Sequence, residues 1–436
     1  MVNDTSRLLG LEGLAVVGVE AAEDDVVVHL VTAHEQARVC PECGSLARRL
    51  KGWATTRPRD LPVGGRLPRL VWRKRRWYCD QPSCRRGSFT EAVPDIPPRK
   101  RLTGRLRAAA GAAVADRGAT IVQSARDHAV SWPVVAAAFA AHAVAVLPAQ
   151  PDPVAVLGID EIRRGRPHWV ADEAGGWKAT VDRWHVGFVD LSGGQGLLGQ
   201  VEGRTAQVVI DWLDARPPTW RQQVRFVAID MCTIFKSAVR RALPQAQLVV
   251  DHFHLIQLAN QTLTEVRRRV TTQVRGRRGR KGNREWELRN RLTRSAARMR
   301  GEHVDGLLDE IGALPTAIAT PILAAWHAKE DLHDLLALAR TQPNRQTIAA
   351  RLYQFYRRCA ASGLDELNRL ATTVNTWWPE ILAFIQTGIT NAGSEGTNRV
   401  IKTLARDAYG FRNPTSQRLR TRCATTRRTR GHLNPA

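Results

Sequence analysis

The sequence lacks an apolar stretch long enough to cross a membrane, and it lacks an amino-terminal targeting signal. Its longest apolar stretch, residues 133–148, is rich in alanine and contains His142. A membrane span needs roughly 18 apolar residues, so this stretch is too short. The first residues, MVND, do not form a basic region followed by an apolar run. We therefore expect a soluble, cytoplasmic protein without a membrane partner.

Acidic residues are scarce relative to basic ones. The chain has 41 Asp and Glu residues against 65 Lys and Arg residues, which gives a formal net charge of +24. Such an excess indicates a polyanionic partner, and nucleic acid is the commonest polyanion. A generally solvated basic surface, or association with a ribosome, is the alternative. With 436 residues, 43% of them hydrophobic, the chain is expected to form two to four domains with a sizeable core.

Cysteines are few and odd in number, which argues against a set of disulfides. Four of the seven form two close pairs, with the spacings C-x2-C and C-x4-C: Cys40, Cys43, Cys79 and Cys84. Four thiolates on two tight turns can complete a tetrahedral site for one structural zinc ion, with no position left for a substrate. The alternative is four unrelated buried cysteines. Cys232, Cys359 and Cys423 stand alone, and we expect them to be small core residues.

Two valine-rich, partly alternating segments open the chain, over residues 14–19 and 25–31. Because residues 21–24 separate them, they predict a β-hairpin within residues 1–38. The cysteine pairs follow within residues 39–95. This segment is therefore the expected zinc ribbon.

Prolines within residues 94–98 mark a linker to a helical segment, residues 99–147. We expect three helices there, over residues 102–116, residues 120–128 and a segment that begins near residue 131. Thr120 and Ser131 are expected to cap the second and third helices, with Pro133 in the first turn of the third. Two short helices joined by a tight turn resemble a helix-turn-helix, which binds DNA. An ordinary three-helix core is the alternative.

Beyond residue 152 the pattern changes to short apolar runs that alternate with amphipathic helices. We expect strands over residues 154–160, 185–191, 196–201, 224–230 and 247–251, and helices over residues 205–215 and 233–243. Three strands, a helix, a strand, a helix and a strand is the order of the ribonuclease H fold.

This order defines the expected fold class, which is a multidomain α/β protein. Its ribonuclease H-like core comprises residues 152–262 and residues 387–436, the latter with a basic tail. An all-helical insertion, residues 263–386, interrupts the core. The zinc ribbon and the helix-turn-helix precede it.

Two acids end apolar strands of the expected core. Asp160 ends the first strand and Asp230 ends the fourth, so their carboxylates are expected to lie side by side. Adjacent carboxylates repel each other unless cations lie between them. Two Mg²⁺ or Mn²⁺ ions held there would activate the attacking oxygen and stabilise the leaving oxygen in phosphoryl transfer. The alternative is that both are strand-end turn residues.

A third acid, Glu395, lies in a late helix that we expect Ser394 to cap. Polar and basic residues follow it at i+3, i+4, i+7 and i+11: Asn398, Arg399, Lys402 and Arg406. These positions share one helix face, which would ligate metal and contact DNA phosphates together. A solvated helix face is the alternative.

These motifs together resemble the transposases of the ISL-three insertion-sequence family, a DDE-type group. The resemblance covers nearly the whole chain and rests on the two cysteine pairs and four further segments: residues 8–14, residues 158–161, residues 250–254 with the pattern D-x-F-H, and residues 390–402 with residues 408–413. One departure is residues 163–183, which are longer than usual and leave the boundary of the second strand in doubt.

The resemblance implies that Asp160, Asp230 and Glu395 are the catalytic triad. Asp251 and His254 would organise the site or hold DNA without ligating metal. The implied activity is metal-dependent cleavage and strand transfer of double-stranded DNA, at the element's terminal inverted repeats and at a target. We expect a homodimer on DNA, associated with the bacterial nucleoid. A nuclease or resolvase of the same fold that only hydrolyses, and a non-enzymatic DNA-binding regulator, are the alternatives.

A dense basic block, residues 267–300, lies within the expected insertion. Four of its arginines alternate with glycines, which indicates a mobile loop: Arg275, Arg277, Arg278 and Arg280. Such a loop cannot read bases by rigid geometry, but it can neutralise phosphates and release counterions. We therefore expect it to hold DNA without sequence preference. A solvated loop is the alternative.

Overall fold

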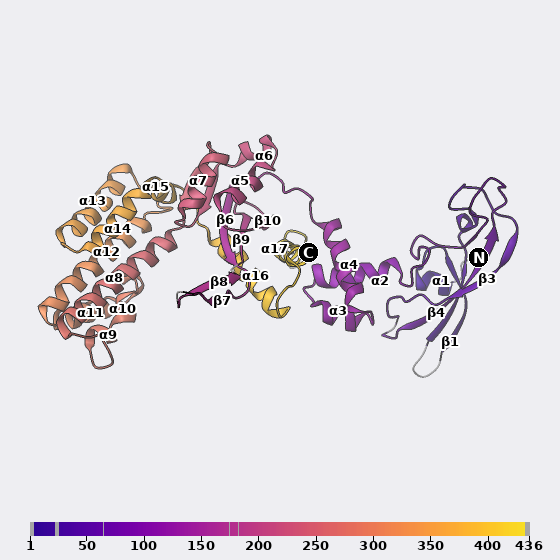
Figure 1. Ribbon diagram of the computed structural model, residues 1–436, viewed down its shortest axis with the longest axis horizontal. Coiled ribbons are helices and arrows are strands. Elements are labelled where there is room, and N and C mark those ends of the chain that lie inside the picture. The colour runs from indigo at the N-terminus through magenta and orange to yellow at the C-terminus, as the bar shows by residue number, and fades with distance from the viewer. Residues whose placement is uncertain (1–3, 22–25, 64, 174, 182, 432–436) are drawn as a thin grey trace. The chain divides into compact units, whose positions relative to one another are not determined.

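The structure is a computed structural model, and it describes residues 4–21, 26–63, 65–173, 175–181 and 183–431. The chain divides into two compact units (Figure 1). The first unit comprises residues 1–150 and 404–436, and the second comprises residues 151–403. Among the described residues no single helix is long and apolar enough to cross a membrane. Only a bent pair, Ile121–Asp127 with Trp132–Val146 at 109°, meets the length and composition criteria together.

The first unit begins with a five-stranded sheet in the order β1-β2-β4-β3, with β5 paired to β4. Its strands are β1 (Leu14–Ala21), β2 (Val26–Thr32), β3 (Leu50–Thr56), β4 (Pro68–Tyr78) and β5 (Ser88–Thr90), with helix α1 (Asp4–Leu9) and the short helix η1 (Glu35–Arg38) beside them. The expected hairpin is present as β1 and β2, while residues 22–24 of its expected turn lie outside the described residues. Because β2 pairs in parallel with β4, residues 1–38 and 39–95 share one sheet.

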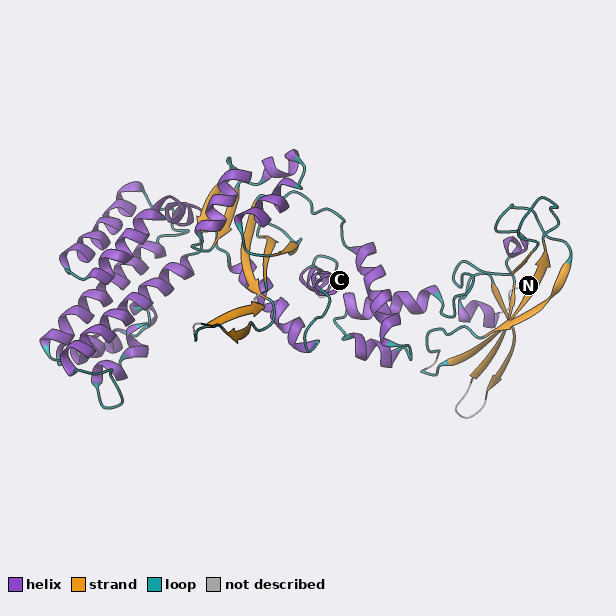
Figure 2. Ribbon diagram, viewed as in Figure 1, coloured by secondary structure: helices purple, strands orange, loops and turns teal. Residues whose placement is uncertain are grey.

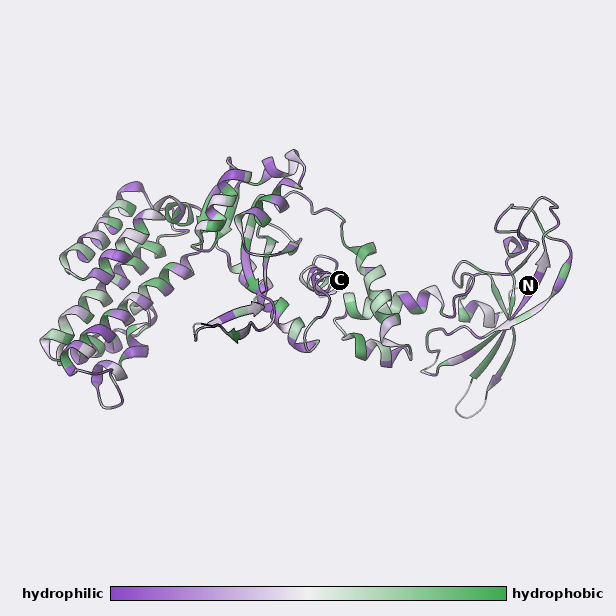
Figure 3. Cartoon of the chain, viewed as in Figure 1, coloured by the Kyte–Doolittle hydropathy of each residue, from purple (hydrophilic) through white to green (hydrophobic). Residues whose placement is uncertain are grey.

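Three helices follow the sheet: α2 (Gly104–Ala115), α3 (Ile121–Asp127) and α4 (Trp132–Val146). Thr120 caps α3 as expected, because its side chain accepts a hydrogen bond from the backbone N–H of Gln123. Ser131 occupies the N-cap position of α4 and Pro133 lies in its first turn, as expected, although the Ser131 side chain makes no capping hydrogen bond. Apolar residues dominate α4 (Figure 3), and Val135 and Phe139 are buried against α2.

The expected linker near residues 94–98 does not separate the sheet from the helices. Arg59, after β3, donates a hydrogen bond of 2.8 Å to the carbonyl of Ala129, between α3 and α4. The buried Asp60 accepts a hydrogen bond of 2.7 Å from the hydroxyl of Thr103 and forms an ion pair with Arg105. These polar contacts hold the sheet against the helices.

The carboxyl-terminal helix α17 (Pro414–Thr425) packs on α2 and α4. The structure groups residues 404–436 with the first unit, whereas the sequence prediction assigned residues 387–436 to the last part of the catalytic core. Cys423 is buried among the apolar side chains of α2 and α4, and Arg427 donates a hydrogen bond to the carbonyl of Ala115. The last carbonyl groups of a helix lack partners within the helix, so arginine side chains that donate hydrogen bonds to them stabilise the packing of the carboxyl-terminal segment on α2.

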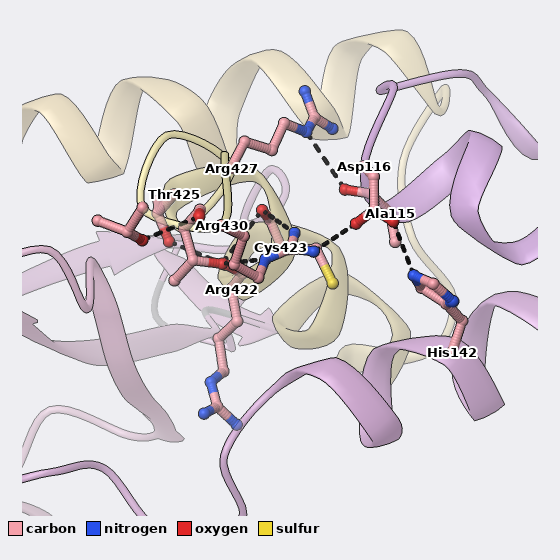
Figure 4. A network of polar contacts seen from close by, with 10 residues as sticks. Ala115, Asp116, His142, Arg422, Cys423, Thr425, Arg427 and Arg430 are labelled. Carbon is pink, nitrogen blue, oxygen red and sulfur yellow. Dashed lines mark hydrogen bonds and ion pairs between the residues drawn. The ribbon is translucent and has the colours of Figure 1, made fainter. Parts of the chain in front are cut away.

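Asp116 links this carboxyl-terminal segment to the helices (Figure 4). Its carboxylate forms an ion pair with Arg430 and accepts a hydrogen bond of 2.7 Å from His142 of α4. Burial alone would raise the pKa of Asp116, but Arg430 and His142 outweigh burial and lower it. The carboxylate is therefore charged and paired at neutral pH.

The second unit contains a five-stranded sheet in the order β10-β9-β6-β11-β12. Its strands are β6 (Val156–Arg163), β9 (Trp184–Asp190), β10 (Leu197–Glu202), β11 (Phe226–Ile229) and β12 (Gln247–Val250). Strand β9 is antiparallel to β6 and β10, while β11 is parallel to β6 and β12. A separate hairpin of β7 (His168–Ala171) and β8 (Trp177–Val181) accounts for the added length of residues 163–183.

Helices complete the second unit (Figure 2). Helices α5 (Ala206–Asp214), α6 (Pro218–Gln223) and α7 (Thr233–Ala242) connect the strands of the sheet. The expected helical insertion follows as α8 (His252–Arg275), α9 (Arg284–Glu287), α10 (Arg289–Leu292), η2 (Ala296–Arg298), α11 (Gly301–Gly312), α12 (Thr316–Ala337), α13 (Arg345–Ala361), α14 (Asp365–Thr376) and α15 (Trp378–Thr387). Helix α16 (Ala392–Asp407) then returns toward the sheet. One hydrophobic core extends from the sheet into the insertion.

Arg430→Ala is expected to lower the free energy of unfolding of the first unit by roughly 1–3 kcal/mol, because it leaves the buried Asp116 carboxylate short of a charged partner. Calorimetric melting of the full chain measures the change. Arg428→Ala is the matched control, because Arg428 is exposed. Equal melting of the two variants would show that the Asp116 ion pair does not hold the carboxyl-terminal segment.

Candidate active site and zinc centre

Two adjacent parallel strands bring the first two acids together. Ile159 of β6 pairs with Ile229, the last residue of β11, so Asp160 and Asp230 each follow one residue of this pair along the chain. The sequence predicted both acids at strand ends, and Asp230 does follow β11 directly. Asp160 instead lies inside β6, which continues to Arg163 because residues 160–163 pair with β9.

Asp160 is almost completely buried, with 9% of its surface exposed. Its carboxylate accepts hydrogen bonds of 2.7 Å from the Asn398 side chain and from the backbone N–H of Glu161. Burial raises the pKa of Asp160 to about 7, and the charges of Asp230 and Glu395 add to the effect. A carboxylate in this position is electrostatically costly unless a cation accompanies it.

Asp230 has a similar environment. Burial raises its pKa, and the neighbouring charges of Asp251 and Glu395 raise it further, while His254 and a hydrogen bond from Asn391 oppose the change. The Nε2 atom of His254 lies 3.1 Å from the Asp230 carboxylate, and the Asn391 amide donates a hydrogen bond of 3.3 Å to it. Two polar side chains therefore fix the orientation of this acid.

Asp251 and His254 lie where β12 passes into α8. Asp251 is buried and caps α8 by accepting a hydrogen bond of 3.2 Å from the backbone N–H of Phe253. Ligand atoms of Asp230, Asp251 and His254 lie within 4.8 Å of one another. The position of His254 against Asp230 suits the organising role that the sequence resemblance implies.

Helix α16 supplies the third acid. It begins at Ala392, three residues earlier than a cap at Ser394 would give, so Ser394 lies within the first turn and not at the cap. The Ser394 hydroxyl is buried and has no hydrogen-bond partner among the described residues. Glu395 is half-buried, and its charge contributes to the raised pKa values of both Asp160 and Asp230, so Glu395 lies near both aspartates.

The close approach of α16 to β6 depends on a glycine. A Cβ atom at Gly158 would overlap the Ser394 hydroxyl and lie 3.0 Å from the Asn391 side-chain oxygen. Asn391 is fully buried and also donates a hydrogen bond of 3.3 Å to the carbonyl of Ile159. Sequence reasoning did not single out Gly158 or Asn391 for a role, although both lie in segments that carry the family resemblance.

The basic residues expected to bind DNA have different environments. Arg275 forms an ion pair of 2.6 Å with Glu285, and Arg277 donates a hydrogen bond of 3.1 Å to Asn283. Internal contacts therefore hold the loop that was expected to be mobile. Of the stripe on α16, Asn398 faces Asp160, while three residues are exposed: Arg399, Lys402 and Arg406.

The four paired cysteines form a second site in the first unit. Their Sγ atoms lie within 4.8 Å of one another, with 4.0 Å between Cys40 and Cys84 and 3.4 Å between Cys43 and Cys79. A tetrahedral zinc site with Zn–S bonds of about 2.3 Å requires sulfurs about 3.8 Å apart, so the geometry fits one zinc ion. Gly44, with φ of 72°, makes the tight turn after Cys43.

The pKa values of the thiols show why this cluster suits a cation. Hydrogen bonds from the hydroxyl and backbone N–H of Ser45 lower the pKa of Cys43 to about 6. The backbone N–H of Gln81 favours the Cys79 thiolate, but desolvation and the neighbouring thiols outweigh it and raise the pKa of Cys79 to about 12. Four thiolates held this close together would repel one another, and a bound zinc ion would stabilise them. Of the lone cysteines, Cys359 and Cys423 are buried as expected.

Two family models match the chain, one over the segment with the three acids and one over the segment with the four cysteines. A family model described as a transposase, of the DDE type in ISL-three elements, matches residues 157–421. The chain belongs to the ISL-three family of DDE transposases. A second model, described as the zinc-finger of transposases IS204, IS1001, IS1096 and IS1165, matches residues 36–84.

Similar proteins carry the same description. The transposase for insertion sequence element IS1001 from Bordetella parapertussis is 26% identical over 413 residues, which cover 93% of this chain and 93% of that protein. A solved structure entitled Drosophila P element transposase strand transfer complex aligns with a TM-score of 0.40 and 10% identity, over 76% of this chain and 93% of that chain.

This ISL-three transposase is therefore a DNA-cleaving and strand-transferring enzyme of the DDE class, with a structural zinc ribbon. The family also implies a divalent metal at the acidic site. These family matches favour a transposase over the two alternatives, a nuclease that only hydrolyses DNA and a non-enzymatic regulator.

Cys43→Ser is expected to remove the bound zinc, because three thiolates do not complete a structural site and metal binding supplies folding free energy. Elemental analysis of the purified full chain measures zinc content, with an expected change from one ion to none. Cys232→Ser is the control, since Cys232 lies outside the cluster. Full zinc retention in the Cys43 variant would contradict a four-cysteine site.

Gly158→Ala is expected to reduce DNA cleavage at least about tenfold while leaving most of the fold intact, because the added methyl group pushes the first turn of α16 away from β6. Gly396→Ala on the same helix is the control, because its Cβ would meet open space. Cleavage rates and circular dichroism of both variants measure the effect. A Gly158 variant as active as the Gly396 variant would show that this close approach does not position Glu395.

Proposed function

We propose that this transposase cleaves and joins DNA at the ends of its insertion sequence with Asp160, Asp230 and Glu395 as catalytic residues. The observation that carries the proposal is the convergence of three acids from β6, β11 and α16 at one buried site, where the pKa of Asp160 is raised to about 7. If the three acids had only a structural role and bound no cation, the repulsion among their carboxylates would destabilise the fold. A site that takes up divalent cations explains why the three acids are held together.

We propose that the second unit has a ribonuclease H-like core formed by residues 152–262 and the amino-terminal part of residues 387–436. Its strand order and directions support this, because three antiparallel strands continue into two parallel ones. The helical insertion, residues 263–386, then separates Glu395 from the other two acids. Folding, not proximity in sequence, brings the triad together.

The three acids would hold two Mg²⁺ or Mn²⁺ ions. Their oxygen donors match the preference of these hard cations. When bound, the ions supply Lewis acidity for the attacking water or 3′ hydroxyl and for the leaving oxygen. The protein's own polar groups orient the ligands: Asn398 holds Asp160, while Asn391 and His254 hold Asp230. No covalent enzyme intermediate is required.

We propose that the first unit recognises the terminal inverted repeats with its zinc ribbon, residues 39–95, and its helix-turn-helix, residues 99–147. A groove of about 1370 Å³ supports this, because it lies between the sheet and the start of α4. Cationic side chains line it, among them Arg57, Arg69, Arg101 and Arg107. Such a groove suits the phosphates that flank a helix placed in the major groove.

Further exposed cations would contact DNA phosphates near the catalytic site. Those on α16 are Arg399, Lys402 and Arg406, and those in the loop after α8 are Arg278 and Arg280. Because an element has two ends, we propose a homodimer that places one active site at each. Its substrate is chromosomal DNA, so the proposed location is the cytoplasm, at the nucleoid.

Asp160→Asn, Asp230→Asn and Glu395→Gln are each expected to abolish strand cleavage and to leave binding of the element's ends nearly unchanged. The acids act on charge that develops in the transition state, whereas phosphate contacts supply affinity. Cleavage of an end duplex in Mg²⁺ and gel-shift binding measure the two effects. Asp305→Asn is the control, because Asp305 is exposed on α11. Cleavage by any triad variant at the control's rate would refute the assignment.

A further inference from the structure

A groove of about 1030 Å³ lies in the second unit, between α8 and residues 291–303 of the helical insertion. Its wall on α8 includes His252, Phe253 and Asn260. The same helix carries His254, whose imidazole contacts Asp230. The groove therefore begins within one turn of the acidic site.

Cations without internal partners line this groove. Arg294, Arg298 and Arg300 are exposed, and none of them has an ion-pair partner among the residues that the structure describes. They differ from Arg275, which is held by Glu285, and from Arg291, which is held by Glu310. The cations available to an anionic ligand thus lie 14 to 20 residues after Arg280, the last arginine of the loop that the sequence indicated, and within the same basic block.

Two shielded polar atoms in the groove wall also have no partner within the described part of the chain. They are the Oδ1 atom of Asn260 and the Nε2 atom of His333. Burial lowers the pKa of His333, and the charge of Arg298 lowers it further, so the imidazole is neutral at pH 7. An unsatisfied buried polar atom is energetically costly, and a ligand with hydrogen-bonding edges would relieve that cost.

An aromatic side chain completes the groove. Phe253 has 54% of its surface exposed, although it lies between His252 and His254 at the start of α8. Exposed aromatic rings beside cationic side chains are the features that bind nucleic-acid single strands, because bases stack on the ring and phosphates pair with the cations. Unpartnered polar atoms beside them suit base edges, which a duplex keeps in its base pairs.

We propose that this groove binds a segment of single-stranded DNA next to the phosphodiester at the acidic site. A base stacks on Phe253, its edge reaches Asn260 or His333, and the following phosphates pair with Arg298 and Arg300. The inference rests on the proposed function, because it assumes that the acidic site cleaves DNA. It adds that the strand beside the cleavage point is unpaired and held by the insertion.

The test uses the full chain with Asp160→Asn, so that the probe is bound but not cut. The probe is an oligothymidylate of about 15 nucleotides, within the range of single-strand site sizes, that carries one 5-iodouracil and a fluorescent label. Ultraviolet cross-linking followed by peptide mapping reports which aromatic residue a base contacts. Fluorescence anisotropy against salt concentration reports the number of phosphates neutralised.

We expect the cross-link at Phe253, lost in Phe253→Ala and kept in Phe253→Tyr. Tyr353→Ala, which removes an exposed aromatic residue from α13, is expected to leave the cross-link unchanged. The Arg298→Ala, Arg300→Ala double variant is expected to lower the salt-dependence slope by about 1.4, since each single-strand phosphate contact contributes roughly 0.7. Arg345→Ala with Arg357→Ala removes the same charge from α13 and is expected to preserve the slope.

Three results would overturn the proposal: a cross-link that does not map to Phe253, equal slopes for the two double variants, or equal competition by a duplex of the same length. The last result would assign the groove to double-stranded DNA. Cleavage of end DNA by the chain without Asp160→Asn is measured separately. Intact cleavage without the cross-link would refute the groove alone, while a cross-link without cleavage would refute the catalytic proposal alone.

Discussion

Repulsion among carboxylates is the physical constraint on which the catalytic unit depends. Asp160 and Asp230 occupy matching positions on neighbouring strands, and α16 brings Glu395 to them, so three negative groups meet where water is largely excluded. Burial raises the pKa of both aspartates, which means that the protein alone does not stabilise their charged forms. Hydrogen bonds from Asn391 and Asn398 orient the acids but do not neutralise them. Divalent cations bound between the three acids would complete the electrostatics, and the same cations would supply the Lewis acidity that the proposed reaction needs.

Helix α16 belongs to both units, because it begins in the second unit and ends in the first. Its first turn carries Glu395 in the second unit, and residues 404–407 at its end belong to the first unit. The chain then continues into α17, which packs among α2 and α4 and is held by the Asp116 and Arg430 ion pair. The helix that supplies the third acid is thus anchored, at its far end, in the unit that we propose binds the element's ends.

Much of the core is predictable from the sequence because apolar runs that end in an acid indicate buried strands. This pattern identified β6 and β11 and therefore Asp160 and Asp230. Glu395 was singled out by its place near a helix start and by the polar and basic stripe that follows it, and the family resemblance then implied its place in the triad with Asp160 and Asp230. Two details differ from the prediction. Ser131 and Ser394 match the composition of helix caps, but neither side chain makes a capping hydrogen bond, which side-chain geometry decides. Residues 404–436 were grouped with the catalytic core as a basic tail, whereas α17 packs on α2 and α4 with Cys423 buried among their apolar side chains.

The position of the metal ions tests this account most directly. Crystals of the full chain grown with Mn²⁺ and measured at the manganese absorption edge locate each ion by its anomalous signal. The account predicts manganese between Asp160, Asp230 and Glu395, with His254 in contact with Asp230 and not with metal. Manganese held by Asp230, Asp251 and His254, without Asp160 or Glu395, would contradict it.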